Sequence, residues 1–275
     1  MRFSLGALLA LATACLTPAL TATAQSVAAS PSTYIGPRFA GGPDSLRALV
    51  YRSVQQAGAA PKGRILLKFE LSNEGKPRKS ELVRPPKPLN PALVNAAAKA
   101  GDYLQAQPLA WQPGTPDPDF PPSTDAPKVL LALDFTATAP ATRPYSYADQ
   151  NPIFAGMADQ LRARKMKYYD ELLANPAKVA KYTSSLSGLA AFVQMQTRYP
   201  VEALRNQEQG TVYAYFEVAE SGAIEQAEIL GTAGRALDAE VLRIIQQLPT
   251  ATTPAMLQGR PVRVYYVLPI TWKII

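Results

Sequence analysis

The chain has 275 residues, enough for one large domain or two of ordinary size. Its 47% hydrophobic and 18% charged residues are typical of a folded globular protein. The absence of histidine excludes Ser-His-Asp and Cys-His catalysis, and the single cysteine excludes a thiolate zinc site. The net charge of +7 is modest for this length and favours a mildly basic, solvated surface.

The first 24 residues have the pattern of a secretory signal peptide. Arg2 is followed by an apolar run, and small residues lead to a cleavage position after Ala24. Two other interpretations stay open: an uncleaved membrane anchor over Phe3–Leu20, interrupted by Pro18, and lipidation of Cys15. Cleavage predicts a periplasmic protein that lacks both cysteine and histidine, so apolar cores must hold it together. Export also argues against a nucleic-acid partner.

Two stretches of the chain repeat each other. A constant offset of 147 positions (210 minus 63) relates Gly63 to Gly210, Phe69 to Phe216, Glu70 to Glu217, and Gly75 to Gly222. A Pro-x-Phe-Ala-Gly motif also occurs twice, beginning at Pro37 and at Pro152, which are 115 positions apart. The second copy therefore carries 147 minus 115, or 32, extra residues after its opening motif. We interpret the chain as a duplicated unit, at 34–136 and 186–275, joined by a linker and a basic helical insert at 137–185.

The first copy is expected to fold as a helix, a hairpin, a second helix and a final strand. Strands are predicted at Arg64–Leu71 and about Arg78–Val83, joined at Gly75, because glycine supplies the positive φ of a tight turn. Asn90 stands before a proline, which is typical of a helix N-terminus. The final strand is predicted at Val129–Phe135.

The second copy repeats this order. A hairpin is predicted from Thr211–Ala219 and Ile224–Leu230, a helix at Leu237–Leu248, and a final strand at Val262–Trp272. The predicted fold class is therefore α+β, with two units that are each a small three-stranded antiparallel sheet packed by helices.

Two segments differ in kind from the repeated units. Gln105–Pro127 holds seven prolines and is predicted to be a long loop. The insert around Arg162–Ser185 is rich in Lys, Arg and Tyr, and such a helix could contact anionic lipid or peptidoglycan. The alternative is a solvated helix whose Leu161, Tyr168 and Leu172 pack on their own domain.

The second copy resembles the TonB C-terminal domain family over about Leu186–Ile275. The positions that carry the resemblance are Tyr199-Pro200, the Gly210–Gly222 strand frame, Leu237-Asp238-x-Glu240, Gly259-Arg260-Pro261-Val262, and Leu268-Pro269-Ile270-Thr271-Trp272. The first copy looks like a diverged member, because it keeps the strand frame but lacks the Tyr-Pro opening and the closing Pro-Ile-Thr-Trp.

The resemblance implies binding to a segment of an outer-membrane TonB-dependent transporter by β-strand addition. A three-stranded sheet leaves edge N–H and C=O groups free, and the last strand is the natural edge, with pairing ending at Pro269. The partner-binding residues expected on this basis are Gln196, Tyr199, Pro200, Val262, Val264 and Tyr266. The alternative for Tyr199-Pro200 is a structural role, in which the pair forms a turn and packs on its own domain.

The chain departs from the energy-transducing members of this family. Those members have an uncleaved N-terminal helix with a functional histidine and a long proline-rich spacer, whereas this chain has no histidine and a second domain. An ExbB/ExbD-type complex is therefore expected as a partner only if the N-terminus stays anchored. The alternative function is a periplasmic scaffold whose units pair with each other or with a second copy in a homodimer. No enzymatic activity, cofactor or metal is expected.

Overall fold

A computed structural model describes residues 36–59, 61–107, 110–112, 114, 128–164 and 169–274. The predicted signal peptide, Cys15, Tyr168 and most of the proline-rich loop lie outside the described residues.

The first unit contains one three-stranded antiparallel sheet in the order β3-β2-β5, with a short β1-β4 pair beside it. Its elements are β1 (Arg38–Phe39), α1 (Gly42–Gln56), β2 (Arg64–Leu71), β3 (Pro77–Leu82), α2 (Pro91–Ala106), β4 (Trp111–Gln112) and β5 (Lys128–Asp134).

The second unit contains an antiparallel sheet in the order β10-β6-β7 and a β8-β9 hairpin. Its elements follow a short 3-10 helix, η1 (Pro140–Thr142), and are α3 (Ala155–Arg164), α4 (Asp170–Ala174), α5 (Pro176–Ser184), α6 (Leu186–Gln196), α7 (Val201–Arg205), β6 (Gly210–Val218), β7 (Ile224–Gly231), α8 (Arg235–Ile245), β8 (Ala255–Leu257), β9 (Arg260–Val262) and β10 (Val264–Trp272). The predicted α+β class is confirmed.

In each sheet the first strand of the hairpin, β2 or β6, is central. The last strand of the unit, β5 or β10, pairs with it on the side opposite the hairpin partner. The turn glycines are used in the same way. Gly75 and Gly222 have φ of 77° and 84°, and their carbonyls accept hydrogen bonds from the backbone N–H groups of Trp111 and Ala251 at 3.0 and 2.9 Å. A Cβ on either glycine would lie 1.6 or 2.2 Å from the carbonyl oxygen of that same residue. Only glycine therefore fits at these turns.

The last predicted strand, Val262–Trp272, is divided in the structure. Val262 belongs to β9 and pairs with Ala255, whereas Val264 begins β10 and pairs with Val218. The division follows from the β8-β9 turn, where Gln258 and Gly259 have positive φ and start a separate hairpin.

The basic insert is also divided rather than one helix. Asn175 separates α4 from α5, because its side chain accepts hydrogen bonds from the backbone N–H groups of Ala177 and Lys178. Leu161 is buried in the core of the second unit, and Leu172 packs against that core. This apolar side therefore packs on its own domain.

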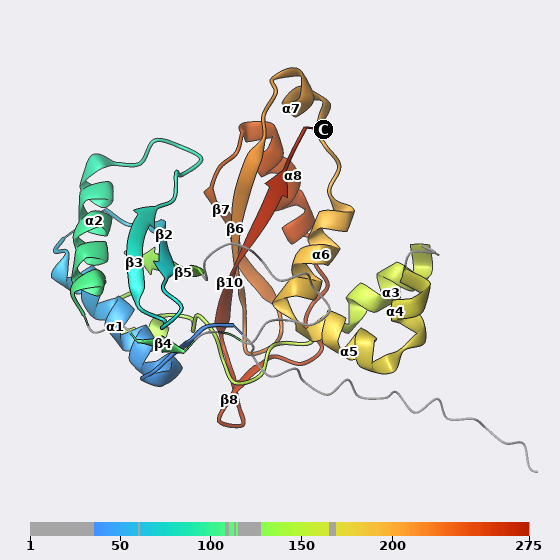
Figure 1. The fold of residues 1–275 in the computed structure, drawn as a ribbon, viewed down its shortest axis with the longest axis horizontal. Coiled ribbons are helices and arrows are strands. Elements are labelled where there is room, and N and C mark those ends of the chain that lie inside the picture. The colour runs from blue at the N-terminus through green and yellow to red at the C-terminus, as the bar shows by residue number, and fades with distance from the viewer. Residues whose placement is uncertain are drawn as a thin grey trace, which may run out of the picture.

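Strand alternation gives each sheet two buried faces. One face of each sheet packs against helices: Leu67 and Phe69 lie in the first helix-covered core, and Ala214 and Phe216 lie in the second. The other two faces meet between the units in a third cluster formed by Leu66, Ala132, Tyr215, Leu230, Tyr265 and Val267. Figure 1 shows the result as two sheets side by side, with α1 and α2 outside one and α6 and α8 outside the other.

Candidate functional site

β10 is an outer strand that is only partly paired on its free side. On one side it pairs with β6 from Val264 to Trp272. On the other side Tyr145 forms a single parallel bridge: its N–H donates to the carbonyl of Arg263, and its carbonyl accepts from the N–H of Tyr265, both at 2.9 Å. Among the described residues no other strand pairs with this edge. Within the described part of the chain, this edge is therefore unpaired from Val267 onward.

The register determines which backbone groups the open edge presents. Because the N–H of Tyr265 points to Tyr145, the alternate residues Val267, Pro269 and Thr271 also direct their backbone groups outward. Pro269 has no N–H to offer, but its carbonyl remains. Pro269 and Thr271 are both exposed. The edge thus presents donors at Val267 and Thr271.

Val264 and Tyr266 take a different part in this strand. Their backbone groups point toward β6, and their side chains lie in the core of the second unit. The ring of Tyr266 lies 5.7 Å from the ring of Phe216. These two predicted residues hold the strand in place, and the outward groups belong to their neighbours in sequence.

The other predicted residues fall at opposite ends of β10. The Tyr199 ring packs edge-on against Trp272 with ring centroids 5.1 Å apart, and Pro200 precedes α7 as its N-cap. Gln196 ends α6 and donates a hydrogen bond to the side chain of Gln160 at 3.4 Å. Val262 lies in β9, just before the start of β10 at Val264. The structure brings Tyr199 to the open end of β10 and places Val262 at the end where Tyr145 already pairs.

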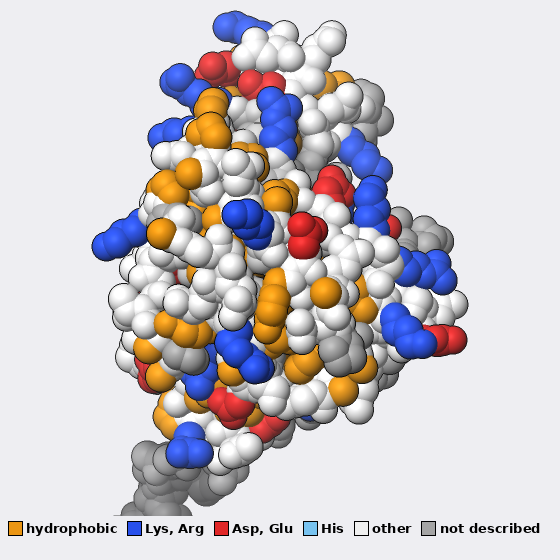
Figure 2. Space-filling model, turned by 90° about the vertical axis from the view of Figure 1, so that its left-hand side faces the viewer, with side chains coloured by type: hydrophobic (Ala, Val, Ile, Leu, Met, Phe, Trp, Pro, Cys, Tyr) orange, Lys and Arg blue, Asp and Glu red, His pale blue; other side chains and the backbone are white. Residues whose placement is uncertain are grey.

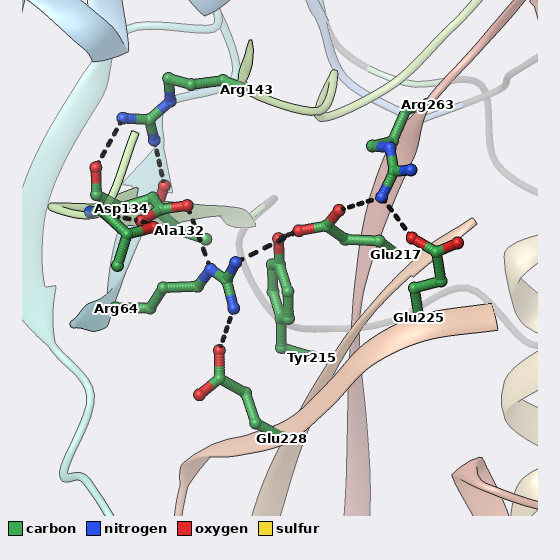
Figure 3. Close-up of polar contacts among 10 residues, drawn as sticks. Arg64, Ala132, Asp134, Arg143, Tyr215, Glu217, Glu225, Glu228 and Arg263 are labelled. Atoms are coloured by element: carbon green, nitrogen blue, oxygen red, sulfur yellow. Dashed lines mark hydrogen bonds and ion pairs between the residues drawn. The ribbon is translucent and has the colours of Figure 1, made fainter. Parts of the chain in front are cut away.

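An ion-pair cluster that the sequence did not predict lies between the two sheets (Figure 3). Arg64 on β2 contacts Asp134 at 3.2 Å in its own unit, and reaches Glu217 at 3.4 Å and Glu228 at 2.7 Å in the second unit. Its guanidinium also lies 4.9 Å from the centre of the Tyr215 ring. One arginine of the first unit therefore links both sheets.

Glu217 is the shared anion of this cluster. It is 4% exposed, and it accepts hydrogen bonds from the Tyr215 hydroxyl at 2.7 Å and from Arg263 at 3.0 Å. Arg263 also reaches Glu225 at 2.7 Å. Burial, together with the neighbouring charge of Glu217, raises the pKa of Tyr215. The phenol therefore stays protonated and continues to donate to Glu217.

The charges of this cluster are mutually compensated. Burial by itself lowers the pKa of Arg64, but the hydrogen bond to Glu228 and nearby negative charge raise it further, so the net shift is upward. Burial raises the pKa of Asp134, but hydrogen bonds from Thr136 and the charge of Arg64 lower it more, so the net shift is downward. Both groups are thus held in their charged forms.

The outer edge of the first sheet is closed by side chains. Arg143, 5% exposed, donates to the backbone carbonyls of Ala132 and Asp134 on β5 at 2.8 and 3.2 Å. The N–H of Ala132 donates to the Tyr265 hydroxyl at 3.3 Å. Burial lowers the pKa of Arg143. These bonds occupy the outward groups of β5 that a further strand would need.

The apolar cluster between the two sheets has a signal in the sequence. The run Val264–Leu268 is continuously apolar, and β6 alternates core residues with Tyr213, Tyr215 and Glu217. Strands with apolar or aromatic residues on both faces are typical of sheets buried on both sides. This pattern indicates a covered second face, but not which segment of the chain covers it.

Three further features concern the charged side chains, the lengths of the helices and the grouping of potential metal ligands among the described residues. On the face of the molecule drawn in Figure 2, Lys and Arg side chains are scattered among apolar and uncharged ones. Within the described part of the chain, no helix is both long and apolar enough to cross a membrane, and no group of three or more potential metal ligands occurs.

Residues 195–274 match the family model of the Gram-negative bacterial TonB protein C-terminal. The matched segment runs from the end of α6 through β10, so it contains the whole β10-β6-β7 sheet and the open edge. Comparisons with curated proteins and with solved structures give no match.

Proposed function

Because residues 195–274 form a TonB C-terminal domain, we propose that this chain binds a segment of an outer-membrane TonB-dependent transporter. In this proposal the domain serves as an interaction domain of a TonB-like envelope protein, and no catalytic role is assigned to it. In the proposed complex the transporter segment is extended and adds to the sheet as a fourth strand beside β10.

The observation that carries this proposal is the open edge of β10. Val267 and Thr271 direct backbone groups outward, and Thr271 and Pro269 are exposed. The other edges of the two sheets are less suited to strand addition. β3 carries the charged residues Arg78 and Lys79, a charged pattern that discourages edge pairing.

The remaining two edges are also obstructed. The outward carbonyls of β5 are taken by Arg143. β7 is irregular, because Gln226 has a φ of 53° and the pairing register shifts along β6. β10 is thus the edge that offers regular, uncharged backbone to a partner.

The predicted contact residues have distinct roles in this proposal. Tyr199, Pro200 and Gln196 contact the transporter segment near the open end of β10, where Tyr199 lies against Trp272. Val264 and Tyr266 anchor β10 in the core, so the added strand bonds the backbone of Val267 and Thr271. Val262 contributes at the opposite end, next to the bridge with Tyr145.

The proposal also covers the cellular location of the protein and the duplication of its domain. The chain is exported to the periplasm by the signal at 1–24, and the segments 34–136 and 186–275 are duplicates, with 137–185 as a linker and helical insert that packs on the second segment. The shared strand order and the shared turn glycines support the duplication. Coupling to an ExbB/ExbD-type complex is part of the proposal only for a membrane-anchored form.

A second candidate function is an envelope scaffold without energy transduction. The observation that favours it is the packing of the two sheets against each other through Leu66, Tyr215 and Tyr265. In this alternative the second unit has its main partner within the same chain. A second copy of the chain could also pair along β10 in a homodimer, which the oligomeric state in solution would reveal.

Binding of synthetic peptides from the N-terminal segments of outer-membrane transporters to the mature chain tests the first proposal. Thr271→Pro removes one outward N–H of β10, so we expect about tenfold weaker binding. Thr271→Val is the matched control, because it keeps the N–H and the β-branched shape. Circular dichroism and the melting temperature verify that both variants are folded.

Equal affinity of the two Thr271 variants, or no binding of any transporter peptide, would contradict the proposal. N-terminal sequencing of the exported protein tests the location. A chain that starts at Gln25 supports a free periplasmic protein, and a membrane-bound full-length chain supports the anchored form.

A further inference from the structure

A three-residue segment between the units touches the edges of both sheets. This segment, which we call the strap, is Arg143-Pro144-Tyr145. Arg143 donates two hydrogen bonds to outward carbonyls of β5, and the backbone of Tyr145 exchanges two hydrogen bonds with Arg263 and Tyr265 at the start of β10. The strap thus contacts the edge of β5 through the side chain of Arg143, and it contacts the edge of β10 through the backbone of Tyr145.

The side chains of the strap contact the first unit, and the Tyr145 ring also packs against the core of the second unit. The Tyr145 hydroxyl donates to Asp44 on α1 at 2.7 Å, and the guanidinium of Arg47 lies 3.9 Å from the centre of the Tyr145 ring. Arg143 and Pro144 are buried. The contacts with α1 and β5 therefore hold the backbone of Tyr145 in position beside β10.

The position of the strap limits the length of edge that is open on β10. Beyond Tyr145, the outward groups belong to Tyr265, Val267, Pro269 and Thr271, and Pro269 lacks an N–H. A partner strand of about five or six residues fits beside Val267–Trp272, but a strand that pairs along the whole of β10 needs more of the edge. The carbonyl of Arg263 and the N–H of Tyr265 would complete it, and Tyr145 occupies both.

We propose that the strap is an internal competitor for the partner strand, so that full pairing along β10 requires displacement of Tyr145. This inference rests on the proposed function. The strap and the partner strand compete for the same two backbone groups, so binding of the partner weakens the contacts of the strap. Because Arg143 and Tyr145 also hold α1 and β5, occupancy of β10 is coupled to the contact between the two units.

The proposal predicts that loosening the strap strengthens partner binding. Tyr145→Ala removes the ring contacts with Asp44 and Arg47, together with the packing of the ring against the core of the second unit. We expect binding of a transporter peptide to tighten about tenfold, because the open form of the edge becomes more populated. Tyr145→Phe is the matched control, since it loses only the hydroxyl, and its affinity should stay within about twofold of wild type.

Hydrogen exchange gives a second measurement that does not require a peptide. In free Tyr145→Ala the Tyr265 amide should exchange faster than in wild type, because its acceptor is the carbonyl of Tyr145. Addition of the peptide to wild type should speed exchange at Tyr145 and slow it at Val267 and Thr271. Arg143→Met, which removes the bonds to β5, should have the same effects as Tyr145→Ala.

Two results would overturn the strap proposal alone. One is peptide binding that Thr271→Pro weakens but Tyr145→Ala and Arg143→Met leave unchanged. The other is a Tyr145 amide that stays protected in the peptide complex. Peptide binding by neither wild type nor the strap variants would overturn the proposed function, and the strap proposal with it.

Discussion

β5 and β10 occupy equivalent positions in the two sheets, but their free edges differ. On β5 the outward carbonyls of Ala132 and Asp134 accept hydrogen bonds from Arg143, and the outward N–H of Ala132 donates to Tyr265. On β10 only the first residues are paired, by Tyr145. The same topology therefore leaves an edge closed or open according to a few side chains outside the sheet.

The two units also use each other as cover. A sheet with helices on one side normally leaves its other face to water, and here each sheet covers that face of its neighbour. The apolar contacts of Leu66, Tyr265 and Val267 are joined by the ion pairs of Arg64. The two edges keep their different surroundings only while this shared interface is intact.

The largest effect is expected at Arg64. Arg64→Met leaves Asp134 buried without its arginine partner and leaves Glu217 with Arg263 alone, and should lower the free energy of unfolding by about 3 kcal/mol. Lys68→Met is the control, because the Glu81 carboxylate of the Lys68–Glu81 pair is half exposed, and the change should cost less than about 1 kcal/mol. Urea unfolding measures both. Similar losses in the two variants would show that the inter-sheet cluster is no stronger than a surface pair.

The next largest effect is expected at the equivalent turn glycines of the two units, Gly75 and Gly222. Gly75→Ala and Gly222→Ala each force a Cβ against a backbone carbonyl oxygen, and should each lower the free energy of unfolding by about 2 kcal/mol or more. Gly259→Ala is the matched control, because Gly259 has a φ of 75° but has no atom within 4 Å of an added Cβ. It should cost about 1 kcal/mol. If all three cost the same, the turn carbonyl contact contributes nothing beyond the backbone conformation.

The helix starts differ between the units and predict a smaller effect. α2 begins at Asn90, whose side chain accepts from the N–H of Ala92 at 2.9 Å, whereas α8 begins at Gly234 without a side-chain cap. Asn90→Ala should lower the free energy of unfolding by about 1 kcal/mol. Asn95→Ala, at an exposed position of the same helix, should be neutral or slightly stabilising. A thermal melt that ranks the two variants equally would argue against the cap.

The smallest effect is expected from Asp238 on α8 and depends on pH. Burial raises the pKa of Asp238 above the usual 3.8, so the folded state binds this proton more tightly than the unfolded state. Its contribution to stability is thus present at low pH and is lost as pH rises through the raised pKa. Asp238→Asn should therefore stabilise the protein near neutral pH but not below about pH 3. Urea unfolding at both pH values measures this.

Glu240 gives a control of opposite sign. The hydrogen bond from Arg243 lowers its pKa, so its contribution is present at neutral pH and is lost as pH falls through the lowered pKa. Glu240→Gln should accordingly destabilise at neutral pH and converge with wild type in acid. A gain for Glu240→Gln, or a loss for Asp238→Asn, at neutral pH would contradict the assigned shifts.

Much of the fold could be predicted from local signals. The strand Arg64–Leu71 is observed with its predicted bounds, and the helix after Asn90 begins where its cap and proline indicate. The division of the last strand at Arg263 was missed, because the pairing of Val262 with Ala255 depends on a turn with unusual backbone angles at Gln258. Side-chain type alone does not reveal such a turn.

The candidate site was predicted in part. The resemblance pointed to the last strand and to Tyr199, which lies against Trp272 at its open end. The α+β class and the repeated turn glycines follow from local periodicity and turn chemistry, and the TonB C-terminal domain follows from the resemblance of its ordered motifs to that family. Which edge is open does not follow from sequence patterns, since it depends on where Arg143 and Tyr145 lie after the two sheets have packed together.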